Sequence, residues 1–238
     1  MASAARTGIP AARAPEVRHF ATVRVTHWLT ALCFAALLIS GANLVISHPR
    51  FYWGESGNVR TPALFELPIP SSRASVQTGF GYVLPDQNGW SRSLHFQAAW
   101  ILVFAGGVYG LFSLTTRHLQ QNLMPARSGL EWRSLLSAGP AGSASYNPLQ
   151  RLTYLAIVFV AFPLMIWTGL AMSPAVVSAL PGTVSVFGGH QSARTIHFAV
   201  TIGLVVFLIG HVAMVYRAGF RARTMAMITG RPGKDREP

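Results

Sequence analysis

Residues 194–217 read RTIHFAVTIGLVVFLIGHVAMVYR, and this stretch decides the fold. The 22 residues between its two terminal arginines carry no formal charge, which is long enough for one helix to cross a bilayer. His197 and His211 lie 14 residues apart within this run. On an α-helix that spacing is just under four turns, so both side chains leave nearly the same face, roughly 21 Å apart along the axis. Imidazole is a common axial ligand of haem iron, so we expect this helix to hold two haems.

The composition indicates an integral membrane protein. Of 238 residues, 51% are hydrophobic and only 11% are charged, whereas a soluble domain carries about 25% charged residues. The formal net charge is +12, which in a soluble protein would suggest a nucleic-acid partner. Beside apolar spans this charge is better explained by anionic lipid head groups, membrane orientation and anionic cofactor groups, so we expect no nucleic acid. The single cysteine, Cys33, leaves no room for a cysteine-ligated metal site.

The hydropathy pattern predicts an all-α, integral membrane bundle of four transmembrane helices. Their expected ranges are about 24–46, 93–115, 151–172 and 193–217. They form a di-haem domain over 23–218, flanked by basic tails. The tails cover 1–22 and 219–238, and a long loop covers 48–92. Pro163 is expected to kink the third helix.

Four spans put both termini on one side of the membrane. Most basic residues lie in the N-terminal tail, in the segment 116–150 and in the C-terminal tail, whereas the loop 173–193 has none. The positive-inside rule therefore predicts that both termini are cytoplasmic. The long loop is then periplasmic, and the protein is a multi-pass component of a bacterial inner membrane.

Four histidines can be paired by their expected depth. His27 and His211 lie toward the cytoplasmic side and form the inner pair, whereas His95 and His197 form the outer pair. Two imidazoles saturate a haem iron and leave no open position for a substrate, so the pattern favours electron transfer. We expect two non-covalent haems b per chain, since a C-x-x-C-H attachment motif is lacking.

Arginines and glycines supply candidate contacts to the same haems. The pattern R-x-x-H occurs three times and puts each arginine one turn nearer the membrane surface than its histidine, where its planar fork suits a haem propionate. The alternative is that these arginines end membrane helices by snorkelling. Three glycines would let a porphyrin approach the backbone, or would serve close helix packing. The arginines are Arg24, Arg92 and Arg194, and the glycines are Gly41, Gly106 and Gly110.

Several stretches resemble the bacterial cytochrome b561-like di-haem membrane subunits, which include the b-type subunits of formate dehydrogenases and nickel–iron hydrogenases. The stretches are RVTHWLTALCFAALLISG, SHPRFYWG, RSLHFQAAW, YNPLQRLTYL, TGLAMSP and GGHQSARTIHF with the downstream GHVAMVY, covering about 24–230. The branch they resemble most is the thiosulfate reductase cytochrome b subunit, whose genes often accompany a periplasmic molybdopterin oxidoreductase. The resemblance implies the same histidine pairing as depth does, and a quinone site next to the inner haem.

The expected function is that of an electron-transfer subunit of a membrane-bound oxidoreductase. It would carry electrons between the quinone pool and a periplasmic redox partner, either a molybdopterin oxidoreductase or a cytochrome, in a direction that the sequence leaves open. The loop 48–92 is the expected docking surface. The alternative is a stand-alone haem oxidoreductase that acts on a small molecule such as superoxide at the outer haem. A haem-free anchor or transporter would leave the paired histidines unexplained.

Overall fold

The computed structural model describes residues 19–58, 60–69, 88–117 and 148–231. Within these ranges four helices are long and apolar enough to cross a membrane. They span Ala21–Ser47, Gly89–Thr115, Leu152–Ala171 and His190–Arg217. The expected all-α bundle of four membrane-spanning helices is therefore confirmed. The N-terminal tail expected at 1–22 lies outside the described residues except for its last four positions.

The bundle is built from two helix pairs. α1 (Ala21–Ser47) packs along α2 (Asn88–Thr115), and α6 (Phe162–Ala171) packs along α9 (His190–Arg217). Among the described residues, direct backbone contact between the two pairs is sparse. Histidine rings instead face each other across the space between the pairs.

The third span is not one regular α-helix. It runs through α5 (Pro148–Ala156), the π-helical turn η2 (Ile157–Ala161) and then α6. At the end of η2 the N–H of Phe162 donates to the carbonyl of Ile157, five residues earlier. Pro163 follows directly, and its ring would clash with the carbonyl four residues before it in a regular α-helix. The irregularity expected at Pro163 therefore takes the form of a widened turn just before it.

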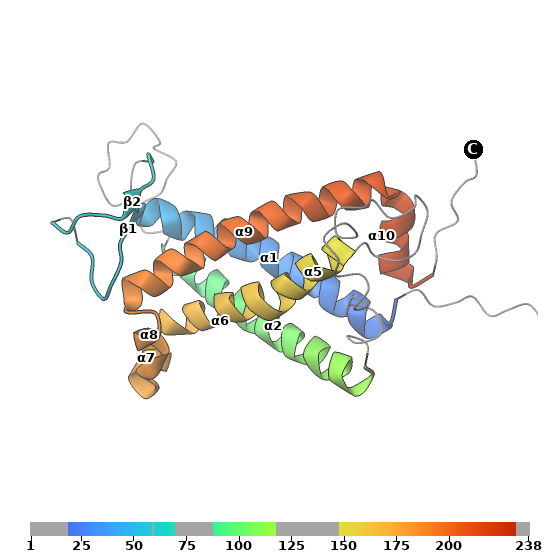
Figure 1. Cartoon of the computed structure of the whole chain (residues 1–238), viewed down its shortest axis with the longest axis horizontal. Coiled ribbons are helices and arrows are strands. Elements are labelled where there is room, and N and C mark those ends of the chain that lie inside the picture. Colours follow the sequence, from blue (N-terminus) through green and yellow to red (C-terminus); the bar gives the residue numbers. More distant parts are fainter. Residues whose placement is uncertain (1–18, 59, 70–87, 118–147, 232–238) are drawn as a thin grey trace, which may run out of the picture.

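Shorter elements lie at the two ends of the bundle, as Figure 1 shows. At one end are the paired antiparallel strands β1 (Arg50–Phe51) and β2 (Phe65–Glu66), with α7 (Pro174–Ala179) and α8 (Gly182–Ser185). At the other end are the start of α1 and the last described helix, α10 (Phe220–Thr229). The segments expected as an irregular loop and as a C-terminal tail thus both contain regular elements.

The helix α10 is fastened to the start of α1 by side chains. Arg24 Nη1 donates to the carbonyl of Ile228 at 2.6 Å, and Trp28 Nε1 donates to the carbonyl of Met227 at 3.2 Å. These carbonyls belong to the last turn of α10, where they lack partners within the helix. The two donors from α1 therefore satisfy the end of α10 and hold it on the bundle.

The first turn of α9 is capped by the segment that follows α1, which we call the β1–β2 loop (48–58 and 60–69). The carbonyl of Gly54 accepts hydrogen bonds from the N–H groups of Gln191 at 3.0 Å and Ser192 at 3.2 Å. The carboxylate of Glu55 accepts from the N–H of His190 at 3.3 Å. These donors have no partner within their own helix, and a carboxylate there is also favoured by the helix dipole. The loop is thereby held at the end of the bundle where α9 begins.

Gly189 allows this close approach. Its φ is +129°, a backbone conformation that residues other than glycine rarely adopt. A Cβ added at this position would also collide with the carbonyl group of Gly54. Two constraints, one torsional and one steric, therefore require glycine at the residue that precedes α9.

We expect Gly189→Ala to detach the β1–β2 loop from α9. Holding a non-glycine residue in such a backbone conformation costs about 1–3 kcal/mol, and the collision adds to that cost. The measurement is limited proteolysis of the protein in detergent, in which cleavage within 48–69 should become faster. Gly203→Ala is the matched control, because Gly203 lies in α9 with open space around it. Equal cleavage of the Gly189→Ala variant and the unmodified protein would contradict this role.

Candidate functional site

Two pairs of imidazoles face each other across the bundle. The ring centroids of His95 on α2 and His197 on α9 are 6.3 Å apart, and those of His27 on α1 and His211 on α9 are also 6.3 Å apart. A metal–imidazole bond is about 2 Å long, so two imidazoles on opposite sides of one metal ion have ring centres about 6 Å apart. Each pair therefore has the separation that a single bis-imidazole metal ion requires.

Each histidine pair offers two imidazoles as metal ligands. Among the described residues, no group of three or more histidine, cysteine, aspartate or glutamate side chains could hold a metal ion. A closed structural zinc site needs four such ligands. Two opposed imidazoles instead suit an ion whose remaining positions are filled by a planar macrocycle, as in haem. The sparse contact between the two helix pairs is consistent with such a group between them.

Each imidazole of the outer pair touches a hydroxyl group. His95 Nδ1 lies 2.9 Å from Ser40 Oγ on α1, and His197 Nδ1 lies 2.9 Å from Thr168 Oγ1 on α6. Each hydroxyl donates its own hydrogen to a backbone carbonyl one turn earlier. Ser40 donates to Ala36 at 2.7 Å, and Thr168 donates to Leu164 at 2.7 Å. The hydroxyl oxygens can therefore accept from Nδ1–H, which leaves Nε2 unprotonated and free to bind a metal.

Glycines lie beside the same two rings. A Cβ added at Gly41 would lie 3.5 Å from Cε1 of His95, and one added at Gly169 would lie 3.6 Å from Cε1 of His197. Each glycine directly follows the hydroxyl residue, so one dipeptide supplies both a hydrogen-bond acceptor and space for the ring. Gly41, expected at the depth of the outer haem, thus lies beside the outer pair.

The inner pair has a different environment. The Nδ1 atoms of His27 and His211 are buried, and neither has a hydrogen-bond partner in the part of the chain that the structure describes. Aromatic rings surround them instead. The ring of Tyr154 is 6.3 Å from that of His211, Phe207 is 5.9 Å from His211, and Trp28 is 5.3 Å from His27.

The arginines of the R-x-x-H pattern have unlike partners. Arg194 donates to the carbonyls of His48 and of Arg50, the latter at 3.1 Å, and its guanidinium lies 4.7 Å from the ring centre of Phe51. Arg24 holds α10, as described above. Arg92 is exposed at the outer end of α2. Two of the three arginines thus fasten segments outside the membrane, a role that neither propionate contact nor snorkelling anticipated.

The two candidate glycines of α2 differ from Gly41 in their surroundings. Gly106 and Gly110 have nothing within 4 Å of an added Cβ, so each faces open space. Ser40, Thr168 and Gly169 were not singled out from the sequence. The available signal was a hydroxyl–glycine dipeptide inside an apolar helix, at 40–41 and again at 168–169.

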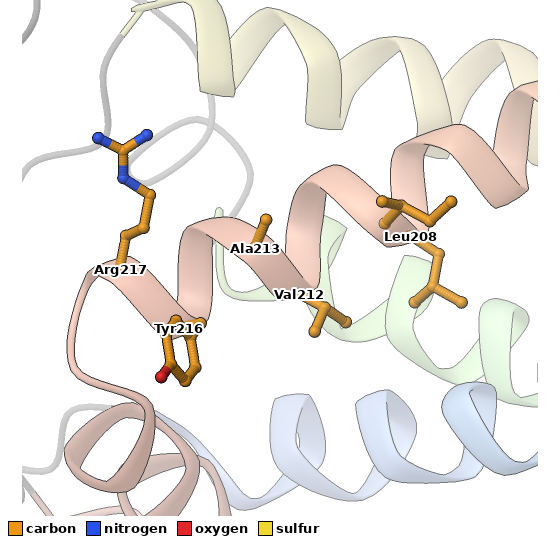
Figure 2. A pocket seen from close by; sticks show the side chains of 6 residues that line it. Leu208, Val212, Ala213, Tyr216 and Arg217 are labelled. Atoms are coloured by element: carbon orange, nitrogen blue, oxygen red, sulfur yellow. The ribbon is translucent and has the colours of Figure 1, made fainter.

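A groove of about 580 Å³ runs along the end of α9 that leads to α10, as Figure 2 shows. Its lining residues are Leu208, Ile209, Val212, Ala213, Tyr216 and Arg217. Successive helical residues are turned by about 100°, so His211 points to the opposite side of α9 from the middle of this set. The groove therefore lies on a different face of α9 from the one that carries the histidines.

Comparison with known proteins shows which family the sequence matches. The family model described as prokaryotic cytochrome b561 matches residues 18–230. A putative protein-methionine-sulfoxide reductase subunit of Azospira oryzae is 28% identical over 203 residues, covering 81% of this chain and 87% of that protein. A probable Ni/Fe-hydrogenase B-type cytochrome subunit of Cupriavidus necator is 28% identical over 234 residues, covering 88% and 82%.

The space beside His95 gives a first test of the outer site. We expect Gly41→Leu to displace the His95 ring and so to lower the haem content of the purified protein by about half, because the inner pair stays intact. Gly41→Ala should keep the full content, because a distance of 3.5 Å is an ordinary van der Waals contact. The measurement is a pyridine haemochrome assay, with Gly203→Leu as the control at an open position. Full haem content in Gly41→Leu would show that this contact is not needed.

Proposed function

The chain belongs to the prokaryotic cytochrome b561 family, and from that premise we propose that it is a di-haem membrane subunit that carries electrons across the bilayer. Its electrons pass between the quinone pool and a redox partner on the periplasmic side. Membership of the family makes it a b-type cytochrome and a multi-pass membrane protein. Family membership alone does not give the number of haems, their ligands, the quinone or the partner. These are proposed here.

One observation carries the proposal. Both histidine pairs have the same ring separation of 6.3 Å. In each, one histidine lies on α1 or α2 and the other lies on α9. His197 and His211 are 14 residues apart in α9, so the two pairs lie roughly 21 Å apart along its axis. Two redox groups stacked in this way span most of a hydrocarbon core of about 30 Å.

The haem iron supplies one-electron chemistry, and two imidazole ligands leave it without an open position for a substrate. The residues of the chain do the rest. His95 and His197 hold the outer group, and His27 with His211 hold the inner one. Gly106 and Gly110 leave open space at the depth of the inner pair, where a porphyrin could approach the backbone. Arg92 is exposed at the outer end of α2 and, unlike Arg24 and Arg194, has no backbone acceptor among the described residues, so it is proposed to meet a propionate.

The proposed orientation puts both termini in the cytoplasm. Arg217, Arg221 and Arg223 lie at the end of the bundle where α10 lies, whereas α7 and α8 at the other end carry no basic residue. The β1–β2 loop at that other end has two arginines, at 50 and 60, which two glutamates, at 55 and 66, balance. The positive-inside rule assigns the basic end to the cytoplasm. The β1–β2 loop is then periplasmic, and the outer pair lies on its side of the bundle.

The β1–β2 loop is the proposed docking surface for the periplasmic partner. It is held on α9 close to His197, since Thr195 Oγ1 donates to the carbonyl of Tyr52 at 2.7 Å. Trp53 next to it is 61% exposed, and aromatic residues are enriched at protein–protein interfaces. The two relatives are named as subunits of a reductase and a hydrogenase, which supports a redox subunit as partner. We place a molybdopterin oxidoreductase first and a cytochrome second.

We expect the purified protein to contain two non-covalent haems b per chain. Two imidazole pairs with equal separations are present, and the sequence has no C-x-x-C-H motif for covalent attachment. A pyridine haemochrome assay combined with protein quantitation measures this directly. A content of one haem per chain, after correction for loss during purification, would remove one pair from the assignment.

His211→Ala tests the function and the orientation together. The variant loses one ligand of the inner pair and should retain the outer haem alone. Quinol is proposed to exchange electrons at the inner haem, so reduction of the remaining haem by a quinol analogue in membrane vesicles should be lost. Reduction by a membrane-impermeant reductant on the periplasmic face should persist.

His197→Ala is the matched variant on the same helix. It should lose the outer haem and keep quinol-driven reduction of the inner one. If His211→Ala were reduced by quinol at the rate of the unmodified protein, the quinone site would not be at the inner pair and the proposed electron path would be wrong.

A further inference from the structure

The two helix pairs of the bundle share a sequence pattern. The first span begins R-V-T-H at 24–27 and carries Ser-Gly at 40–41, whereas the third begins R-L-T-Y at 151–154 and carries Thr-Gly at 168–169. The helices that follow them contain R-S-L-H-F at 92–96 and R-T-I-H-F at 194–198. Matching patterns in the same order are the sign of an internal repeat, which many membrane proteins contain.

The structure places the matched residues in equivalent surroundings. In both pairs the hydroxyl residue is fully buried, donates to a carbonyl four residues earlier at 2.7 Å, and lies 2.9 Å from Nδ1 of the histidine on the partner helix. In both pairs the following glycine faces Cε1 of the same ring, at 3.5 Å and 3.6 Å. The two histidines so contacted are the two members of the outer pair, which therefore lies between equivalent halves.

The one mismatch in spacing has a structural counterpart. From His27 to Ser40 is 13 residues, whereas from Tyr154 to Thr168 is 14. The additional residue falls in the stretch that contains the π-helical turn η2, and a π-turn takes up one residue more than an α-turn. The π-helical turn thus lets both Tyr154 and Thr168 of the third span match His27 and Ser40 of α1.

The halves differ at the inner pair. Tyr154 occupies the position that matches His27, and Tyr109 lies 14 residues after His95, as His211 lies 14 after His197. Only one histidine of each half therefore remains at this depth, and the ring of Tyr154 stands 6.3 Å from that of His211. The repeat is symmetric around the outer pair and has diverged at the inner pair.

We infer that the four membrane-spanning helices are two copies of one helical hairpin, and that Ser40 and Thr168 are equivalent positioning residues that orient the outer imidazoles by accepting hydrogen bonds from Nδ1. This inference rests on the proposed role of the outer pair as haem ligands. Such an acceptor fixes the tautomer and the rotation of the ring and makes Nε2 a stronger electron donor. A more strongly donating ligand stabilises ferric iron, so the two hydroxyls lower the midpoint potential of the outer haem.

The test compares Ser40→Ala and Thr168→Ala in redox titrations of purified protein. Each substitution should raise the midpoint potential of the outer haem and leave that of the inner haem unchanged, and the double variant should show the larger rise. The electron paramagnetic resonance signal of the outer ferric haem should also move, because it depends on the orientation of the two imidazole planes. The His211→Ala background, in which only the outer pair is complete, identifies the haem that shifts.

The repeat itself provides the rescue variants. Ser40→Thr and Thr168→Ser exchange the residues of the two copies, retain the hydroxyl, and should keep the potential of the unmodified protein. Thr26→Ala is the matched control, since Thr26 is buried and donates to a carbonyl four residues earlier, at 2.8 Å, and within the described ranges its hydroxyl has no hydrogen bond to an imidazole. Loss of the outer haem in the alanine variants but not in the exchange variants would also support the role.

Two results would overturn the inference. One is an unchanged outer potential and an unchanged resonance signal in both alanine variants that retain two haems. The other is a shift of equal size in Thr26→Ala. Neither result resembles a failure of the proposed function, which would show as fewer than two haems in the unmodified protein or as retention of both haems in His95→Ala.

Discussion

Four imidazoles in an apolar bundle impose the constraint on which the rest of the structure depends. A polar ring at membrane depth is costly unless its nitrogens find partners. In each pair the rings are held 6.3 Å apart, too far to hydrogen-bond directly and suitable for a shared metal ion. Because the two helix pairs make little direct contact with each other among the described residues, the groups bound between the rings would also join the two halves.

The ends of the bundle are built to hold α9 in place, because α9 contributes to both pairs. At one end the β1–β2 loop satisfies its first backbone donors and binds Arg194 through two carbonyls. At the other end α10 follows after Gly219 and is held by Arg24 and Trp28 of α1. A small rotation of α9 would move both His197 and His211, since they share one face. Fastening the two ends of one helix therefore sets the geometry of two sites.

The spans and the histidine pairing could be predicted from the sequence because both depend on simple periodicity. Length and hydropathy locate a membrane helix, and depth along it sorts the histidines. The roles of Arg24 and Arg194 could not be predicted, because their acceptors are backbone carbonyls of segments distant in the chain. Ser40 and Thr168 were missed for a related reason. A hydroxyl in an apolar helix usually bonds its own preceding turn, and only the structure shows that its remaining lone pair meets a histidine.

The two pairs differ in a way that bears on electron flow. The outer imidazoles have hydroxyl acceptors, whereas the Nδ1 atoms of the inner imidazoles have no partner among the described residues. If each pair holds a haem as proposed, acceptors on Nδ1 would favour ferric iron and so would lower the potential of the outer haem relative to the inner one. In the proposed orientation an electron that moves inward works against the membrane potential, at about 2.3 kcal/mol per 100 mV for a full crossing. The contribution of the hydroxyls would oppose that cost, so in the proposed arrangement this asymmetry would assist transfer from a periplasmic donor toward the inner haem.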